Sequence, residues 1–146
     1  MPYPELTTER MQLLAVIHPD LNQGRYYTPW INMNITHKLL ARVIVGDIGQ
    51  GATVDFELQE ATDANGTGAK AITAKAITQL TQAGGDSNDT CAINLRTEEM
   101  DAANDFDYVR GRLDVNTASA NVCVIIDGDV PRYAPVSTAA YTEVIA

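Results

Sequence analysis

Apolar and polar residues alternate with a period near two along the middle of the chain, which is the pattern of half-buried β-strands. In residues 53–59, the apolar side chains Val54, Phe56 and Leu58 point to one face, and polar side chains point to the other. The glycine-rich segment 46–51 supplies a turn between this strand and the one before it. Similar alternation predicts further strands over residues 35–45, 91–96, 109–115 and 120–126.

The predicted strand over residues 120–126 carries an additional apolar residue. Its inward row is regular, but Ile125 on the opposite face is apolar too. Such a strand is covered on both sides, or is an edge buried against a partner. Loops rich in Gly, Asn and Asp separate the strands, as in antiparallel sandwiches and barrels. We therefore expect an all-β fold, an antiparallel β-sandwich of the jelly-roll kind with at most one short helix.

Helical signals are few. Residues 97–103 predict about two helical turns, with Thr97 as the N-cap and acidic residues in the first turn. Residues 70–82 fit either a helix or a bulged strand, and their threonines and flanking glycines favour the strand. The segment Asp63–Lys70 lacks the spacing of a phosphate-binding loop, so we interpret it as a hairpin loop.

Both ends of the chain differ from the middle. Residues 1–34 contain four prolines and a group of aromatic residues, and residues 131–146 contain two prolines and no helical pattern. We expect an N-terminal arm over residues 1–34, a sandwich domain over 35–130 and a C-terminal tail over 131–146. Aromatic residues in such segments either cap the core or anchor an interface, because Tyr and Trp bury a large area at little entropic cost. The candidate interface residues are Tyr26, Tyr27, Trp30, Arg132 and Tyr133.

The acidic composition restricts the classes of partner. Ten basic and 19 acidic residues give a net charge of −9. This charge disfavours binding to duplex nucleic acid or to an anionic membrane surface. No apolar run approaches the roughly 18 residues of a membrane span. The N-terminus has neither the basic nor the apolar region of a signal peptide, so we expect the chain to stay in the cytoplasm until assembly or lysis.

The sequence contains no recognisable motif of catalytic or metal-binding residues. The histidines His18 and His37 are accompanied by no nucleophile motif. Cys91 and Cys123 fit no metal-ligand spacing, and we expect small buried thiols rather than a disulfide. The acidic cluster over residues 101–107 lacks the glycine and the distal glutamate of a calcium loop, and the clusters 86–89 and 127–129 are interpreted as loop and turn residues. We expect no enzymatic activity, no metal and no cofactor.

The segment Gln59–Lys70, of the form QxATDxxGTGAK, resembles a recurring stretch in small structural proteins of tailed bacteriophages. The resemblance continues through residues 95–101, 106–110 and 131–135 and spans roughly residues 30–136. It implies a β-sandwich that decorates or cements an icosahedral capsid on the virion surface. The implied partners are the major capsid protein and further copies of the chain, as a trimer or other small oligomer. It implies no catalytic residue.

Two other functions remain open. A head–tail connector or tail protein would use an interface that closes into a ring. A carbohydrate-binding module on the virion surface would present Tyr and Trp on one exposed platform, where they stack on sugar faces. The fold alone does not decide among these functions.

Overall fold

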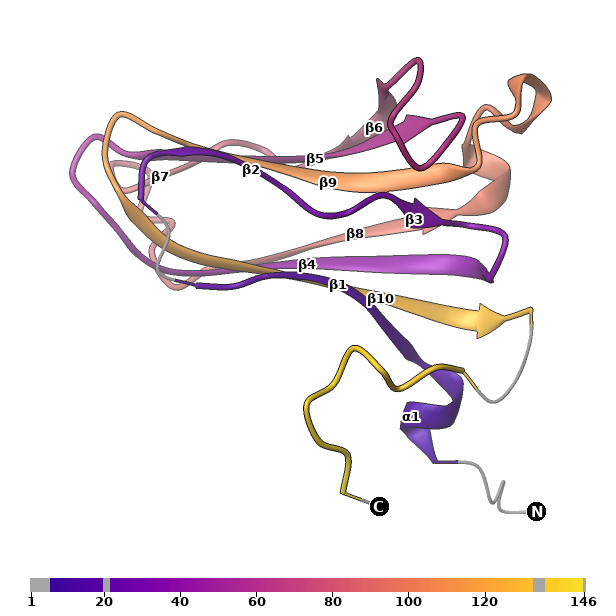
Figure 1. Ribbon diagram of the computed structural model, residues 1–146. Helices are drawn as coiled ribbons and strands as arrows, with labels where there is room; N and C mark the ends of the chain where they lie inside the picture. The colour runs from indigo at the N-terminus through magenta and orange to yellow at the C-terminus, as the bar shows by residue number, and fades with distance from the viewer. Residues whose placement is uncertain (1–5, 20–21, 133–135, 146) are drawn as a thin grey trace.

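In the computed structural model, which describes residues 6–19, 22–132 and 136–145, two antiparallel sheets pack face to face (Figure 1). The four-stranded sheet has the order β1-β10-β4-β8, made of β1 (Gln12–Ile17), β10 (Ala120–Pro131), β4 (Thr36–Ile48) and β8 (Thr90–Arg96). The six-stranded sheet has the order β2-β9-β5-β6, made of β2 (Gly24–Tyr27), β9 (Tyr108–Asn116), β5 (Thr53–Ala61) and β6 (Lys70–Ala76). Two short strands complete it: β3 (Ile31–Asn32) pairs with β9, and β7 (Leu80–Thr81) pairs with β5.

The strand order is that of a jelly roll. Along the chain, the main strands alternate between the two sheets, except that β5 and β6 follow each other in one sheet as a hairpin. This arrangement confirms the predicted all-β sandwich and the hairpin loop over residues 63–70. The bulged strand predicted next is also present, because the pairing of β5 with β6 shifts register between Glu57 and Gln59.

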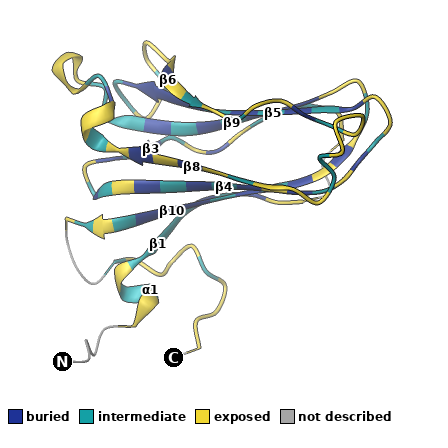
Figure 2. Ribbon diagram, turned by 180° about the vertical axis from the view of Figure 1, so that it is seen from behind, coloured by how far each residue is buried: buried dark blue, intermediate teal, exposed yellow. Residues whose placement is uncertain are grey.

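The core lies between the sheets and is filled by the inward rows of the alternating strands. Figure 2 shows this alternation as buried positions separated by more exposed ones along β4, β5 and β9. The inward rows predicted over residues 53–59, 91–96, 109–115 and 120–126 are found there, whereas Ile35 and His37, expected to face the core with Leu39, are only half-buried and Thr36 between them is buried. The largest fully buried side chains are Phe56, Leu39, Ile48, Leu58, Leu95, Leu113, Ile126, Val43, Val54, Val109, Val115 and Val122.

The turn between β4 and β5 differs from the prediction. The two strands are not paired with each other: β4 pairs with β10 and β8, whereas β5 pairs with β9 and β6. Strand β4 continues to Ile48, which is fully buried, and the chain then crosses from one sheet to the other. At the crossing, the Gly49 N–H donates to the Ser119 carbonyl at 3.0 Å, and a Cβ on Gly49 would lie 2.6 Å from that oxygen.

Three segments of the predicted N-terminal arm, residues 12–17, 24–27 and 31–32, lie in the sheets. Strand β1 pairs with β10, and β2 and β3 pair with β9. The register of β1 shifts between Leu13 and Ala15, which breaks the period-two pattern and hides the strand in the sequence. The C-terminal tail has neither helix nor strand in residues 136–145, as expected.

The predicted helix over residues 97–103 is replaced by two separate 3-10 turns, Thr97–Glu99 and Ala102–Asn104. Thr97 is not the N-cap, because the turn starts one residue earlier, where the Arg96 N–H donates to the Glu99 carboxylate at 2.8 Å. The second turn ends at Asp105, which adopts a left-handed conformation with φ of 62°. The α-helix of the described chain, α1 (Thr7–Arg10), lies instead before β1.

The contact between Phe56 and Gly111 gives a test of the packing. A Cβ at Gly111 would lie 2.7 Å from the buried Phe56 ring, so we expect Gly111→Ala to lower the free energy of unfolding by about 1–3 kcal/mol. Gly46→Ala is the matched control, because its Cβ would meet Asn121 at an acceptable 3.4 Å. Urea unfolding measures both variants. Equal stabilities for the two would contradict the packing described here.

Candidate functional site

The outer surface of the six-stranded sheet carries the densest group of polar side chains. Strands β2, β9 and β5 lie side by side, with Arg25 opposite Asp114, Tyr27 opposite Arg112, and Glu57 also opposite Arg112. Inward neighbours of these residues fill the core, so the polar residues project outward. We call this surface the polar face, and its members are Arg25, Tyr27, Asp55, Glu57, Gln59, Arg110, Arg112 and Asp114.

A continuous chain of polar contacts crosses the polar face. Asp114 accepts from Arg25 at 2.5 Å and from Arg112 at 2.9 Å. Arg112 also contacts Glu57 at 3.0 Å. The Gln59 amide then donates to Glu57 at 2.9 Å and accepts from Arg110 at 2.9 Å. The interaction with Asp114 raises the pKa of Arg25, so this cation stays charged.

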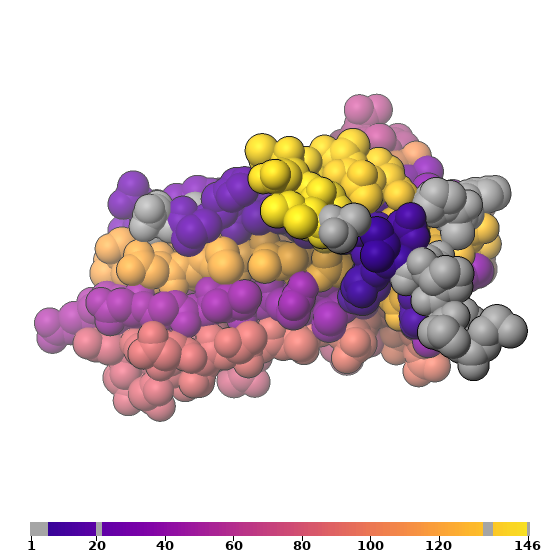
Figure 3. All heavy atoms as spheres, turned by 90° about the horizontal axis from the view of Figure 1, so that it is seen from below, coloured from indigo at the N-terminus to yellow at the C-terminus, as the bar shows by residue number. Residues whose placement is uncertain are grey.

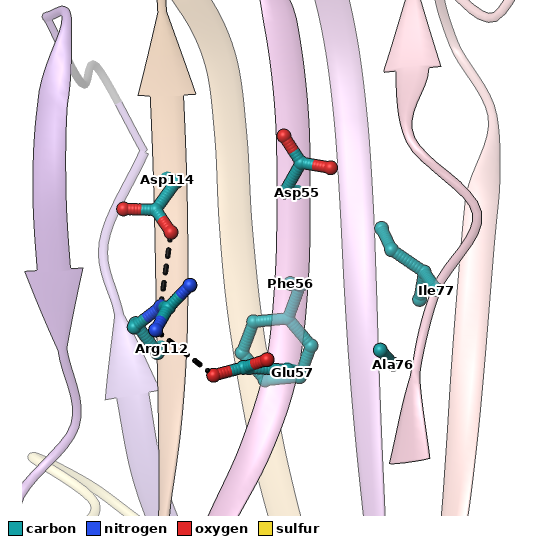
Figure 4. A pocket seen from close by; sticks show the side chains of 7 residues that line it. All are labelled: Asp55, Phe56, Glu57, Ala76, Ile77, Arg112 and Asp114. Carbon is teal, nitrogen blue, oxygen red and sulfur yellow. Dashed lines mark hydrogen bonds and ion pairs between the residues drawn. The ribbon is translucent and has the colours of Figure 1, made fainter. Parts of the chain in front are cut away.

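A hollow opens beside this network, at the boundary of β5 and β6 (Figure 4). It forms where β6 departs from regular pairing, near Ala74 with its φ of 61°. Its volume is about 210 Å³. The carboxylates and the guanidinium line one side and apolar groups line the other; the lining residues are Asp55, Phe56, Glu57, Ala76, Ile77, Arg112 and Asp114.

Two of the predicted aromatic residues meet at the end of the polar face. The Arg110 guanidinium carbon lies 3.9 Å from the centre of the Tyr27 ring and 4.5 Å from that of Trp30. Tyr27 remains 44% exposed. Because a cation is attracted to the ring faces, the three side chains form one stacked unit. Its position follows from Thr28, whose backbone and hydroxyl both bond to Gly111 and hold this segment against β9.

The hairpin loop between β5 and β6 supports this stack. Gly66 packs against Trp30 so closely that a Cβ there would lie 2.8 Å from the indole nitrogen. The loop is held by the Asp63 carboxylate, which accepts from the Thr67 hydroxyl at 2.6 Å and from two backbone N–H groups. The Thr67 hydroxyl, followed by the Thr67 backbone, lowers the pKa of Asp63. The loop between β5 and β6 therefore orders the aromatic end of the polar face.

The outer surface of the four-stranded sheet is mixed, and an apolar group lies there beside the charged residues Arg42 and Asp127. In one cross-strand row Val16 lies opposite Ile125, and in the next Cys123 lies opposite Ile44. These side chains are half-buried, and Ile44 is 37% exposed. Ala92 follows on β8, opposite Arg42. We call this surface the apolar patch, defined by Val16, Ile44, Ala92, Cys123 and Ile125.

The terminal segments lie over the neighbouring part of the same sheet (Figure 3). The Val136 N–H donates to the Glu9 carbonyl at 3.0 Å, which ties the C-terminal tail to α1. Arg10 contacts Asp129 of β10 at 3.4 Å. An ion pair of Arg42 with Asp127 lies beneath these segments, in a shallow hollow also lined by Tyr141.

The other predicted interface residues do not join Tyr27 and Trp30. Tyr26 points inward, packs against the core and donates from its hydroxyl to the Asn22 carbonyl at 2.8 Å. Arg132 is exposed and lines a separate hollow with Met33, Met100 and Phe106. Tyr133 lies outside the described residues. Cys91 and Cys123 are both free thiols, and each is only half-buried rather than fully buried.

Sequence reasoning missed the polar partners of the aromatic residues. Arg110, Arg112 and Asp114 are the polar phase of the strand whose apolar phase was recognised. The same alternation that assigned the apolar residues of this strand to the core also indicates that these polar residues face outward. Which polar residues become neighbours depends on the register of β9 against β2 and β5, which the alternation alone does not give.

Within the described residues, no group of three or more His, Cys, Asp or Glu side chains could hold a metal ion. No helix in that part of the chain is long and apolar enough to cross a membrane.

Comparisons with known proteins assign no family. No protein-family model matches the chain, and no curated protein matches its sequence. Among solved structures, one described as "CBM4 structure and function" matches 88% of this chain and 88% of its own, with 11% sequence identity and a TM-score of 0.35. At this level the similarity assigns neither a ligand nor a function.

The stack around Arg110 can be observed directly, because Trp30 is the only tryptophan of the chain. We expect Arg110→Ala to shift the fluorescence emission of Trp30 to longer wavelength, since water replaces the guanidinium on the ring. Arg96→Ala, which removes an arginine of the other sheet, is the control and should leave the emission unchanged. Identical spectra for both variants would show that Arg110 does not cover the indole.

The Asp63 loop predicts a pH dependence. Because the pKa of Asp63 is lowered below its ordinary 3.8, its contribution to stability is complete above that value and is lost as the pH falls through the lowered pKa. We expect the unfolding free energy of Asp63→Asn to depend less on pH below about pH 4 than that of the wild type. Urea unfolding across this pH range measures the difference. Parallel pH profiles would contradict the assigned role of the carboxylate.

Proposed function

We propose that this chain is a non-enzymatic structural protein of a tailed-bacteriophage virion, a capsid decoration protein that binds the major capsid protein through its apolar patch. The resemblance to small phage structural proteins motivates the proposal. The observation that carries it is the apolar patch, in which Arg42 is the one charged residue, between Ile125 and Ala92, because grouped apolar side chains on an outer surface typically mark an interaction site.

The position of Ile125 explains why a partner is needed. The sequence suggested either that the strand of Ile125 is covered on both sides or that it is an edge buried against a partner. Strand β10 is flanked by β1 and β4, so it is not an edge. Within the described residues, α1 and the C-terminal tail line a hollow with Arg42 and Asp127, and Arg42 is the cross-strand neighbour of Ile125. In the same part of the chain Ile44 stays 37% exposed and Cys123 is only half-buried, so the surface around these two residues can meet a second protein.

The charge of the chain is consistent with a protein partner of neutral or basic surface. A net charge of −9 disfavours packaged nucleic acid and favours a partner whose surface around the contact is less acidic. An icosahedral shell repeats the same contact many times. If the chain binds as a small homo-oligomer, several modest contacts act together and raise the overall affinity.

Removal of the apolar character of the patch tests this proposal. We expect Ile44→Asp to weaken co-sedimentation with capsids of the chain's own phage by about tenfold or more, because the carboxylate would have to be desolvated in the interface. Val130→Asp is the matched control, since Val130 is similarly apolar and 40% exposed but lies outside the patch. It should bind as the wild type does.

Copy number in purified virions separates the proposal from its nearest alternative. A stoichiometry near one chain per capsid subunit supports decoration. A ring-like copy number would indicate a head–tail connector or tail component. Absence of the chain from virions, or full binding by Ile44→Asp, would contradict the proposed docking.

A further inference from the structure

We propose that the polar face is a binding site for a neutral saccharide, on the side of the sandwich opposite to the apolar patch. The inference goes beyond the proposed function, because it concerns a different sheet and a different class of ligand. It rests on three features of the polar face: the hydrogen-bonding groups of its side chains, its balanced charge and its exposed aromatic ring.

The side chains of the polar face offer both donors and acceptors for hydrogen bonds to hydroxyl groups. Guanidinium groups only donate hydrogen bonds, carboxylates only accept them, and the Gln59 amide does both. Cross-strand pairing places Arg112 beside Glu57, and Asp114 beside both Arg25 and Asp55. Since a sugar hydroxyl both donates and accepts, adjacent hydroxyls can bridge such alternating donors and acceptors. The ion pairs of Asp114 with Arg25 and of Arg112 with Glu57 and Asp114 keep these groups fixed in advance, which lowers the entropic cost of binding.

The charge of the polar face argues against an ionic ligand. Its three arginines, Arg25, Arg110 and Arg112, are matched by three carboxylates, Asp55, Glu57 and Asp114. An anionic ligand would meet these three carboxylates, all of which line the hollow, and a cationic ligand that spans the face would meet the three arginines. A neutral polar molecule avoids both repulsions.

Shape and aromatic surface point to a sugar ring. The hollow beside Glu57 and Ile77 has about 210 Å³, smaller than the roughly 300–1,000 Å³ of pockets for drug-sized ligands. One of its walls is polar and the other is apolar, which matches the hydroxyl edge and the C–H face of a pyranose. Tyr27 lies across the same row as Arg112 and Glu57, and its ring is held by Arg110 while 44% of the residue stays exposed. A second sugar of a chain can stack there.

Affinity electrophoresis of the full chain in gels containing soluble polysaccharides tests the proposal. The probes are the neutral polymers dextran, mannan, galactan and β-glucan, with alginate as an anionic polymer. We expect at least one neutral polymer to retard the chain, and we expect Tyr27→Ala to weaken that retardation by about tenfold. Tyr141→Ala, a tyrosine on the four-stranded side, is the matched control and should be retarded like the wild type.

A second variant protects the test against misfolding. Asp55→Ala removes an acceptor that lines the hollow and whose contact in the structure is with the Gln79 amide, at 2.8 Å. Circular dichroism melting establishes that each variant is folded. Loss of retardation in a folded Tyr27→Ala or Asp55→Ala chain supports the site. No retardation by any neutral polymer, retardation by alginate alone, or unchanged retardation of both variants would overturn it. None of these outcomes depends on capsid binding, so this proposal and the proposed function fail separately.

Discussion

Burial of the inward rows of β4, β5, β9 and β10 is the constraint on which the rest of the molecule depends. These rows are almost wholly aliphatic, with Phe56 as the aromatic residue that fills the space over Gly111. Because the interior is filled in this way, the two outer surfaces and the ends of the sandwich hold the residues that can meet a partner. The residues that alternate with the inward ones along the same strands form the two outer surfaces. These residues are mostly charged or polar on the six-stranded sheet, whereas on the four-stranded sheet an apolar group lies beside charged residues such as Arg42 and Asp127.

The alternation predicted which residues face the core, but it did not predict which strands pair with each other. Which side of a strand is buried depends on neighbours in the sequence, so Val54, Phe56 and Leu58 could be assigned to the core directly. Pairing depends on contacts between distant segments. The turn at Gly49 therefore reads as a hairpin in the sequence but crosses between sheets in the structure. Strand β1 escaped prediction for a related reason, since its register shift disturbs the alternation over a strand of only six residues.

The candidate sites show the same limit. Tyr27 and Trp30 were predicted as interface residues from their chemistry, and both rings lie against Arg110 at the end of the polar face. Their neighbour Tyr26 points inward, as the alternation of a strand requires. Arg110 lies about 80 residues away in the chain and joins the two rings only through the pairing of β2 and β3 with β9. No local sequence pattern predicts such a contact.

The two outer surfaces suggest two different roles. On the proposed function, the apolar patch is covered in the assembled particle and the polar face stays in contact with solvent. Cys123 lies within the apolar patch and can report on its coverage, while Cys91 serves as an internal reference. Burial, together with Asp89 and Asp86, raises the pKa of the Cys91 thiol, so this reference should react slowly in every state. The decisive measurement is maleimide labelling of Cys123 in the free chain and on particles, followed by mass spectrometry. The account predicts that Cys123 is labelled in the free chain and protected on particles. Equal labelling of Cys123 in both states would contradict it.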